Sequence, residues 1–290
     1  MSILNIQTDY ESYQQIWAAG NGGKSPFSKS IDASFYQLDS DADKIVPSGT
    51  WFGSIPGSNL VRVLPRTTLT AVTSTGAVTI SVANARKFKA TDVLVAIVPL
   101  AFATFASTWA NADTATFTFG GDYSITHTVS GFTTLTALAT AAAVTLNADV
   151  WFNRRYIAIA DGAIVYFYPL VSGQPTAPLF SVSKSSVGTL TASGTSFTSQ
   201  LSLGTIATGG INTTTNVITL TGNVDRILPA GYPIGVASSA PIGLLDKPVD
   251  LIRGSIQDIG LYTGGSVYES RLDYIDGELK NDPQFSFTYV

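Results

Sequence analysis

The sequence predicts a mainly β protein, and three observations point to that class. Short apolar runs alternate with Thr or Ser and are separated by Gly, Pro and Asn, as strands and tight turns require. Convincing helical spacing is confined to one segment, near residues 134–147. The chain has 290 residues and no cysteine, so it can bury a sizeable core that ordinary packing must hold together.

The sequence is poor in charge. Charged residues make up 12% of the chain, about half the usual share, and the net charge is −4. An acidic chain without a cluster of Lys and Arg has no field to attract nucleic acid. With one histidine and no cysteine, we expect no catalytic site, no cofactor and no metal. We expect partners to cover much of the outer surface.

Residues 1–43 are expected to form an extended N-terminal arm. The start of the chain lacks the basic and apolar regions of a signal peptide. A helical spacing of aromatics is followed by the Gly-rich segment 20–23, which favours a docking arm or, equally, an extension packed on its own domain. The residues expected to contact a partner are the arm aromatics Tyr10, Tyr13, Trp17, Phe27, Phe35 and Tyr36.

From residue 44 onward the signals are strands separated by turns. A β-rich run at 45–53 is broken by Pro47 and Gly49, and strands are predicted at 60–64 and 78–82. The segment 93–110 holds about eighteen uncharged residues, close to the roughly twenty that span a membrane. Pro99 and several hydroxyl residues interrupt it. We therefore expect a buried strand that leads into a bend, and no membrane partner.

The middle of the chain predicts a compact unit. Hairpins are expected at Gly120–Asp122 and at Asp161–Gly162, where turn residues separate two β-like runs. Between them, Leu135, Leu138, Ala142 and Leu146 recur at helical spacing in the segment 134–147. The order predicts a β-β-α-β-β unit over residues 113–184.

Two segments of the chain echo each other without a gap, Asn84–Asp92 and Asn223–Gly231. Each follows a strand and runs through an apolar anchor into a tight turn and a new strand. The second also echoes Ile45–Gly53, because Pro fixes φ and Gly supplies the turn. The residues expected to define the turns of the fold are Pro47, Gly49, Pro229, Gly231 and Gly243.

The second copy of this pattern resembles a known family. The run Ile227–Gly231, a strand to Gly235 and then Pro241–Asp250 resembles the head decoration (cement) proteins of tailed phages. The resemblance covers about 44–64 and 217–261. It implies a β-tulip-like domain over 44–68 and 204–290, with residues 69–203 as an inserted β-rich module that contains one helix.

The same resemblance implies a function without catalysis. Members of this family sit on the outer capsid surface of the virion, after synthesis in the host cytoplasm. They stabilise contacts between capsomers, usually as trimers, with an N-terminal arm that completes a sheet of the major capsid protein. The expected partners are therefore the major capsid protein and further copies of the chain. The extra length leaves a homo-trimer and a homo-dimer at a two-fold open.

Two alternatives remain open. A tail or baseplate adhesin could bind host glycans with Trp51, Trp109 or Trp151, although buried packing is the commoner role of Trp. A glycan-cleaving enzyme would need paired carboxylates, such as Asp273 and Glu278 in an acidic stretch with Glu269 and Asp276. Because Arg271 and Lys280 interleave with these residues, a solvated face or a partner contact is the better interpretation.

Three weaker patterns are interpreted without chemistry. The segment 18–25 matches a relaxed phosphate-binding loop, but it lacks the preceding strand, so a hinge explains it better. Asp39, Asp41 and Asp43 alternate like calcium ligands, yet the Gly and Glu of such a loop are missing. His127 lies in an alternating segment, and we expect it on the surface of a strand.

Overall fold

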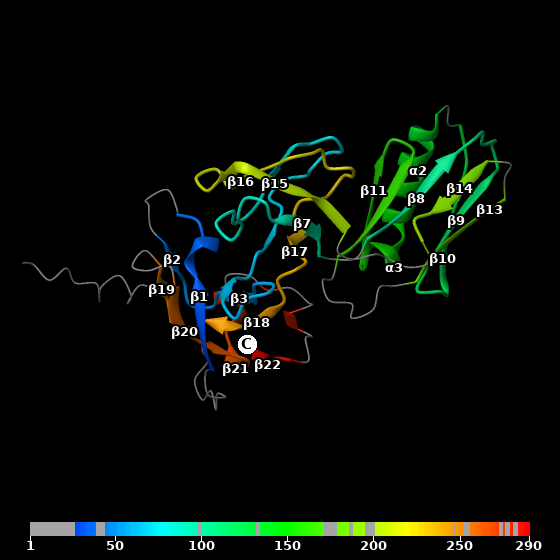
Figure 1. Ribbon diagram of the computed structural model, residues 1–290. Coiled ribbons are helices and arrows are strands. Elements are labelled where there is room, and N and C mark those ends of the chain that lie inside the picture. Colours follow the sequence, from blue (N-terminus) through cyan, green and yellow to red (C-terminus); the bar gives the residue numbers. More distant parts are fainter. Residues whose placement is uncertain are drawn as a thin grey trace, which may run out of the picture.

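The computed structural model describes residues 27–38, 44–97, 100–131, 134–170, 179–185, 188–194, 201–245, 247–251, 256–272, 275, 279–280 and 284–290. The structure is mainly β, with 49% strand and 11% helix, which confirms the predicted fold class. It has three parts, which we call the barrel, the central sheet and the module. The barrel and the module lie at opposite ends of the molecule, with the central sheet between them (Figure 1).

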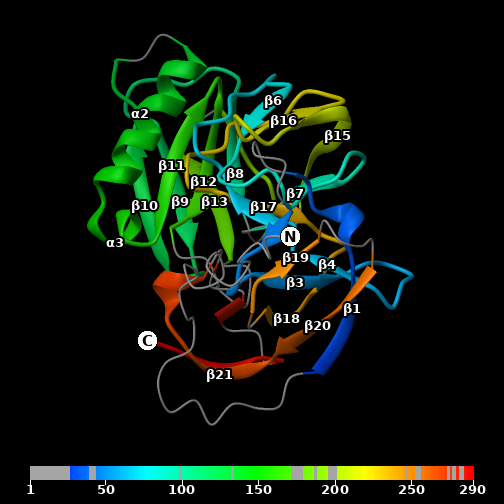
Figure 2. The same cartoon turned by 90° about the vertical axis from the view of Figure 1, so that its left-hand side faces the viewer.

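The barrel combines the first described strand of the chain with strands from its C-terminal part. Its strands close in the order β1-β20-β18-β3-β4, in which all neighbours are antiparallel except β1 and β4. The strands are β1 (Phe27–Asp32), β3 (Trp51–Ser54), β4 (Val61–Val63), β18 (Pro241–Leu245) and β20 (Ile256–Tyr262). Residues 27–32 of the expected arm are therefore a barrel strand, and Figure 2 shows this strand beside β20.

Short elements surround the barrel. The 3-10 helix η1 (Ala33–Phe35) follows β1, and β2 (Ile45–Val46) pairs with β19 (Val249–Asp250). At the C-terminus, β21 (Gly264–Val267) and β22 (Ser286–Tyr289) pair in parallel, and η2 (Glu269–Arg271) lies between them in the chain. A small cluster around Trp51 and Val267 joins this C-terminal pair to the barrel.

The central sheet joins parts of the chain that the sequence had assigned to different domains. Its order is β5-β17-β7-β15-β16-β6. The strands are β5 (Arg66–Thr68), β6 (Thr79–Ser81), β7 (Val93–Ala96), β15 (Leu201–Asn212), β16 (Val217–Leu220) and β17 (Pro233–Val236). Hydrogen bonding thus crosses the expected boundaries at 68 and 203. The segment that leaves this sheet and returns to it is 100–194 instead of 69–203, because an alternating apolar pattern identifies a strand but not its partner.

The module, residues 100–194, is a curled pair of sheets covered by helices. One sheet has the order β10-β9-β13 and the other β11-β12-β8-β14. Its elements are β8 (Ala101–Ala106), β9 (Thr114–Phe119), β10 (Tyr123–Thr128), α2 (Leu135–Ala148), α3 (Val150–Asn153), β11 (Tyr156–Asp161), β12 (Ile164–Pro169), β13 (Phe180–Ser185) and β14 (Thr189–Ala192).

The structure confirms both predicted hairpins, β9–β10 and β11–β12, and the predicted helix. Helix α2 begins where the Thr134 hydroxyl accepts a hydrogen bond from the amide of Ala137, a typical N-cap. The short helix α3 was not predicted, since four residues are too few for a periodic signal. Its signal is local, because the Asp149 carboxylate caps the amides of Trp151 and Phe152.

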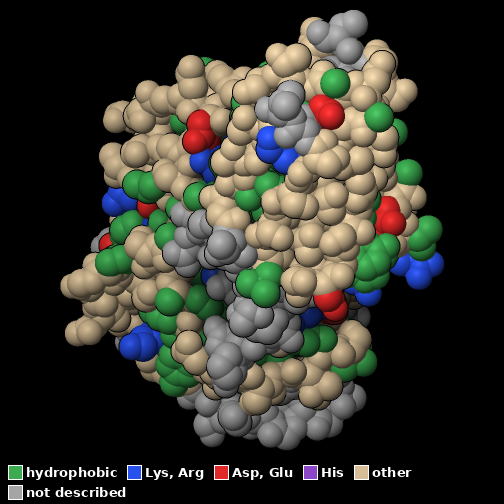
Figure 3. All heavy atoms as spheres, turned by 90° about the vertical axis from the view of Figure 1, so that its right-hand side faces the viewer, with side chains coloured by type: hydrophobic (Ala, Val, Ile, Leu, Met, Phe, Trp, Pro, Cys, Tyr) green, Lys and Arg blue, Asp and Glu red, His purple; other side chains and the backbone are tan. Residues whose placement is uncertain are grey.

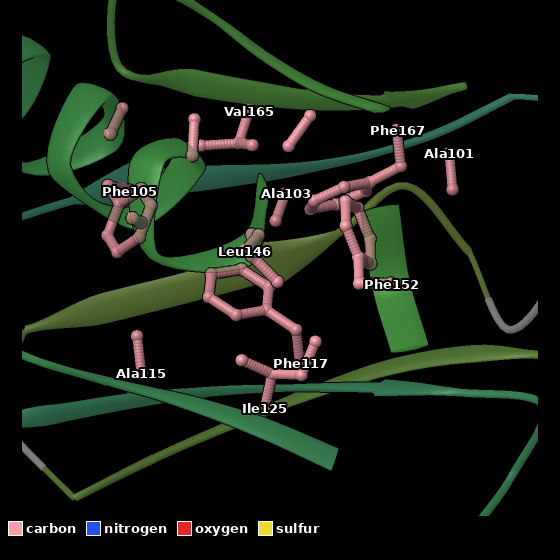
Figure 4. Close-up of a cluster of buried hydrophobic side chains, with 14 of the residues drawn as sticks. Ala101, Ala103, Phe105, Ala115, Phe117, Ile125, Leu146, Phe152, Val165 and Phe167 are labelled. Atoms are coloured by element: carbon pink, nitrogen blue, oxygen red, sulfur yellow. The ribbon is translucent and has the colours of Figure 1, made fainter. Parts of the chain in front are cut away.

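An aromatic cluster forms the core of the module. Phe117 and Phe119 point inward from β9 and meet Phe167 of β12 edge to face, at centroid distances of 5.7 and 5.4 Å. Figure 4 shows the rings of Phe117 and Phe167 together with Leu146 of α2. The helix contributes mainly Ala and Leu on its buried face, so its backbone packs close to β11 and β12.

Strand β12 belongs to two cores at once. Val165 and Phe167 point into the module, whereas Tyr166 and Tyr168 point into the apolar cluster of the central sheet. All four side chains are at most 5% exposed. The Tyr168 hydroxyl donates a hydrogen bond to the carbonyl of Ile227, and burial raises the pKa of Tyr168 well above its ordinary value. Tyr168 therefore stays a neutral hydrogen-bond donor that links the module to the central sheet.

The turn that the sequence repeats occurs three times in the structure, each time with the same hydrogen bonds. A fully buried residue (Val46, Phe88 or Leu228) precedes a turn whose third following residue has positive φ. The amide of the residue with positive φ donates to the carbonyl of an apolar residue on a neighbouring segment. The amide of that apolar residue donates in return to the carbonyl of the residue that follows the one with positive φ. The three pairs of donor and acceptor residues are Gly49 and Leu245, Thr91 and Ile206, and Gly231 and Leu69.

The structure corrects the gap-free alignment of the two longer copies. Phe88 and Leu228 are equivalent, as are Thr91 and Gly231, so the second copy carries one extra residue after its Asn. The copies also pair with each other. Strand β6 lies antiparallel to β16 and β7 lies antiparallel to β17, as expected if a two-fold relates the two halves of the central sheet. Gly243 is not in a turn, because it lies within β18.

We predict opposite stability changes at the two equivalent turn positions. Thr91 is β-branched and exposed at φ 75°, a strained conformation that glycine adopts freely. Thr91→Gly should therefore raise the free energy of unfolding by about 0.5 kcal/mol. Gly231→Ala should lower it by about 1 kcal/mol through φ alone, since an added Cβ meets no atom within 4 Å. Urea denaturation of both variants checks this, and a loss of stability in both would contradict it.

Candidate interaction surfaces

Three of the aromatics that were expected to contact a partner are described by the structure, and they lie in and beside the barrel. Tyr36 is only 3% exposed, and the guanidinium of Arg86 lies 4.7 Å from its ring centroid. Phe27 packs against the barrel core from β1. Both rings contribute to the core of their own domain, as expected for an extension packed on that domain. Tyr10, Tyr13 and Trp17 lie outside the described residues, and so do the phosphate-loop and calcium-loop patterns at 18–25 and 39–43.

A cluster that we call the charged clamp lies between the barrel and the central sheet. Its residues are Phe35, Arg62, Lys89 and Asp92. Arg62 of β4 is 3% exposed and binds both carboxylate oxygens of Asp92, at 2.9 and 2.7 Å. The Arg62 guanidinium and the Lys89 ammonium lie 4.5 and 4.2 Å from the Phe35 ring centroid. Asp92 also accepts the amide of Lys89, so the clamp fixes the turn that leads into β7.

We predict that this clamp is worth far more than an exposed ion pair. Asp92→Ala leaves the Arg62 charge buried without its partner, which should lower the free energy of unfolding by about 3 kcal/mol. The matched control is Glu269→Ala, which breaks the pair with Lys280, in which the glutamate and lysine side chains are 44% and 36% exposed. We expect this control to change stability by less than about 1 kcal/mol. Equal losses in the two variants, measured by denaturant titration, would show that the clamp does not behave as a buried pair.

The outer side of the sheet β10-β9-β13 is a grid of hydroxyls, which we call the hydroxyl face. On each strand the residues that alternate with the buried ones are all Ser or Thr. The strand register aligns them in three rows of three. The rows are Ser185, Thr114 and Thr128, then Ser183, Thr116 and Thr126, then Ser181, Thr118 and Ser124.

Hydrogen bonds within the rows order this face. The bonded oxygens are 2.7 Å apart for Thr114 and Ser185, 2.9 Å for Thr116 and Thr126, and 2.8 Å for Thr118 and Ser124. Figure 3 views the molecule from the side on which β9 and β13 lie in Figure 1, and most of the surface is tan, with few charged side chains. The module as a whole has 7 charged residues among the 95 from 100 to 194. Sequence reasoning missed this face, although the strict alternation of Ser and Thr along three strands could have revealed it.

The three tryptophans of the adhesin hypothesis are packed against other side chains. Trp51 is 2% exposed and meets Phe285 and Phe287 edge to face. Trp109 is 6% exposed, and its indole nitrogen donates to the carbonyl of Ala106. These two indoles offer no open ring face on which a sugar could stack.

Trp151 is covered in a different way. Tyr123 stacks on it at 4.0 Å, and the guanidinium of Arg155 lies 4.6 Å from the ring centroid. A stacked ring and a guanidinium cannot share one face of an indole at these distances, so both faces are covered. None of the three indoles is therefore an open platform for a glycan.

His127 is buried, which corrects the expected surface position. It is 8% exposed and faces α2, where its Nδ1 lies 2.8 Å from the hydroxyl of Thr145. That hydroxyl already donates to the carbonyl of Ala141, so it accepts from His127, and Nδ1 carries the proton. Burial lowers the pKa of His127 below its ordinary value. The sequence predicted the strand β10 correctly, but His127 lies on the side of this strand that faces α2.

We predict that His127 makes the fold sensitive to mild acid. Its pKa is lower in the folded than in the unfolded chain, so the unfolded chain binds more protons below about pH 6.5. The stability that neutral His127 contributes is complete above that pH and is lost as the pH falls towards the folded pKa. The variant His127→Asn keeps a hydrogen-bond donor near the Nδ1 position but does not titrate. Between neutral pH and pH 5, its free energy of unfolding should therefore fall less than that of the wild-type protein. The measurement is urea denaturation at a series of pH values. If the free energy of unfolding falls equally with pH in the two proteins, His127 is not the source of the acid sensitivity.

The C-terminal acidic stretch is described only in part. Glu269 forms an ion pair with Lys280 at 2.5 Å, which fits the interpretation of a solvated face. Asp273, Asp276 and Glu278 lie outside the described residues. Among the residues that the structure does describe, no three His, Asp or Glu side chains come together as a metal site would require.

Neither the family models nor the curated proteins contain a match to this chain. In the described part of the chain, the helices are too short or too polar to cross a membrane.

Proposed function

We propose that the protein is a structural component of a phage virion, a decoration (cement) protein that binds the outer capsid surface and stabilises contacts between capsomers. The observation that supports this best is the arrangement of the two segments that carry the family resemblance. Strand β3 pairs with β18 and β2 pairs with β19, while the amide of Gly49 donates to the carbonyl of Leu245. Segments about two hundred residues apart thus build one small β unit, as the resemblance implies.

The proposed partners are the major capsid protein and further copies of the chain, as a homo-trimer or a homo-dimer. Residues 1–26 directly precede β1, so a segment with Tyr10, Tyr13 and Trp17 would enter the barrel at Phe27. Such a segment could add a strand to a sheet of the capsid protein, with backbone hydrogen bonds for affinity and aromatic contacts for specificity. The shortage of charge in the module suits a surface that neighbours cover.

The test uses heads of the encoding phage that lack this protein. Purified chain should bind these heads in hundreds of copies and raise the temperature at which they release DNA. Deleting residues 1–25 should lower occupancy at least about tenfold, a loss of more than about 1.4 kcal/mol of binding free energy. Bound copies are counted by quantitative gel electrophoresis.

Two controls make this result specific. A chain in which Tyr10, Tyr13 and Trp17 are all changed to Ala keeps the arm length and should lose most of the binding. Unchanged occupancy after the deletion would remove the arm from the proposal. A virion that carries only a few copies, located on the tail by immunogold labelling, would contradict the decoration role and favour the adhesin.

A further inference from the structure

The hydroxyl face is more uniform than a solvent-exposed sheet face needs to be. Charged side chains, Lys above all, are the usual device that keeps sheets with exposed edges from aggregating. In this three-stranded sheet β10 and β13 are the outer strands, and all nine outward positions of the grid carry Ser or Thr, whereas the one charged residue of the three strands, Lys184 of β13, occupies a position of the opposite side. The grid therefore keeps hydroxyls where charge would be the ordinary choice.

The chemistry of the grid excludes most classes of partner. It has no Lys or Arg to attract phosphate and no carboxylate to bind a cation. It also lacks Trp, Tyr and Arg, the residues that anchor protein interfaces. Two copies of this face would bury little apolar area against each other, so a second copy of the chain gains little by docking here.

The hydrogen-bonding capacity that remains is large and ordered. A hydroxyl donates one hydrogen bond and accepts two, so each bonded pair still offers one donor and several lone pairs. The bonds within rows fix these groups in place. Rows repeat about every 6.8 Å along the strands, and columns lie about 4.8 Å apart. Ser and Thr lose little rotamer entropy on binding, which keeps the cost of ordering low.

We propose that the hydroxyl face binds a neutral polysaccharide. Sugar hydroxyls are uncharged donors and acceptors, like those of the grid, and would replace the water along its rows. Each such bond contributes only about 1 kcal/mol net, so a polymer that engages several rows binds where a single sugar does not. Leu179, 57% exposed beside the turn at Gly121, gives the grid an apolar end for sugar C–H groups. Binding at this face is independent of the capsid role, because it needs neither the arm nor a capsid.

The full-length chain is tested by sedimentation with cellulose, chitin and starch granules and by electrophoresis through gels that contain dextran or galactomannan. We expect retention by at least one of these neutral polymers. Retention should not weaken at high salt, because no charged group takes part. Heparin and alginate, which are anionic, should not retain the protein.

Matched variants locate the binding. Thr116→Val with Thr126→Val removes two hydroxyls from the centre of the grid and keeps the β-branched shape. The control is Thr189→Val with Thr191→Val, which removes two exposed hydroxyls from β14, outside the grid. The first pair should lower affinity at least about tenfold and the control less than about twofold. Thr126→Lys, which places a charge in the grid, should also lose binding and serves where the double variant does not fold by circular dichroism.

Three results would overturn the proposal. One is that none of the neutral polymers retains the wild-type chain. Another is equal retention of the grid variants and the β14 control. The third is self-association of the wild-type chain that the grid substitutions abolish, which would make a second copy the occupant of this face. A loss of head binding on arm deletion, with polysaccharide binding intact, would separate this proposal from the decoration role.

Discussion

The burial of strand β12 on both faces is the constraint on which the arrangement of the molecule depends. Strands usually bury one side and leave the other to solvent, but β12 places Phe167 in the core of the module and Tyr168 in that of the central sheet. A register shift of one residue would exchange Tyr for Phe and bury two phenol hydroxyls among the rings of the module. The hydrogen bond from the Tyr168 hydroxyl to the Ile227 carbonyl forms only in the observed register, so it stabilises that register over the shifted one. One strand therefore fixes both the packing of the module and its attachment.

Features that depend on local chemistry could be predicted from the sequence. The Asp161–Gly162 hairpin and the helix near 134–147 follow from turn residues and periodicity, and both are present. Features that depend on which strands pair with each other could not be predicted from the sequence. Strands β6 and β7 pair with β16 and β17 from far along the chain, and their alternation is compatible with many partners. The domain boundaries expected at 68 and 203 differ from the sheets for this reason.

The candidate surfaces show the same division between local and long-range information. Composition shows the shortage of charge, and the expectation drawn from it, that partners cover much of the outer surface, stays a prediction. The direction of single side chains needed the fold. His127 points to α2, and Trp151 lies between Tyr123 and Arg155, which no spacing rule anticipates. Phe35 was expected to contact a partner, which stays a prediction, and in the fold its ring lies beside the cations of the clamp. The hydroxyl face becomes evident only when three strands from separate segments lie in register.

The connection of the module to the central sheet bears on how such a chain could diversify. The chain leaves the sheet after β7 and returns at β15, and Ala96 pairs directly with Leu201. A hairpin of a few residues could join these neighbours, so the covalent path of the remaining chain does not require residues 100–194. Packing opposes this freedom, because removing the module would uncover the apolar cluster that Tyr166 and Tyr168 now shield. A replacement module would need closely spaced ends and one strand with apolar residues on its outward face. Recombination could thus exchange the exposed end of the molecule, with its hydroxyl face, while the barrel stayed unchanged.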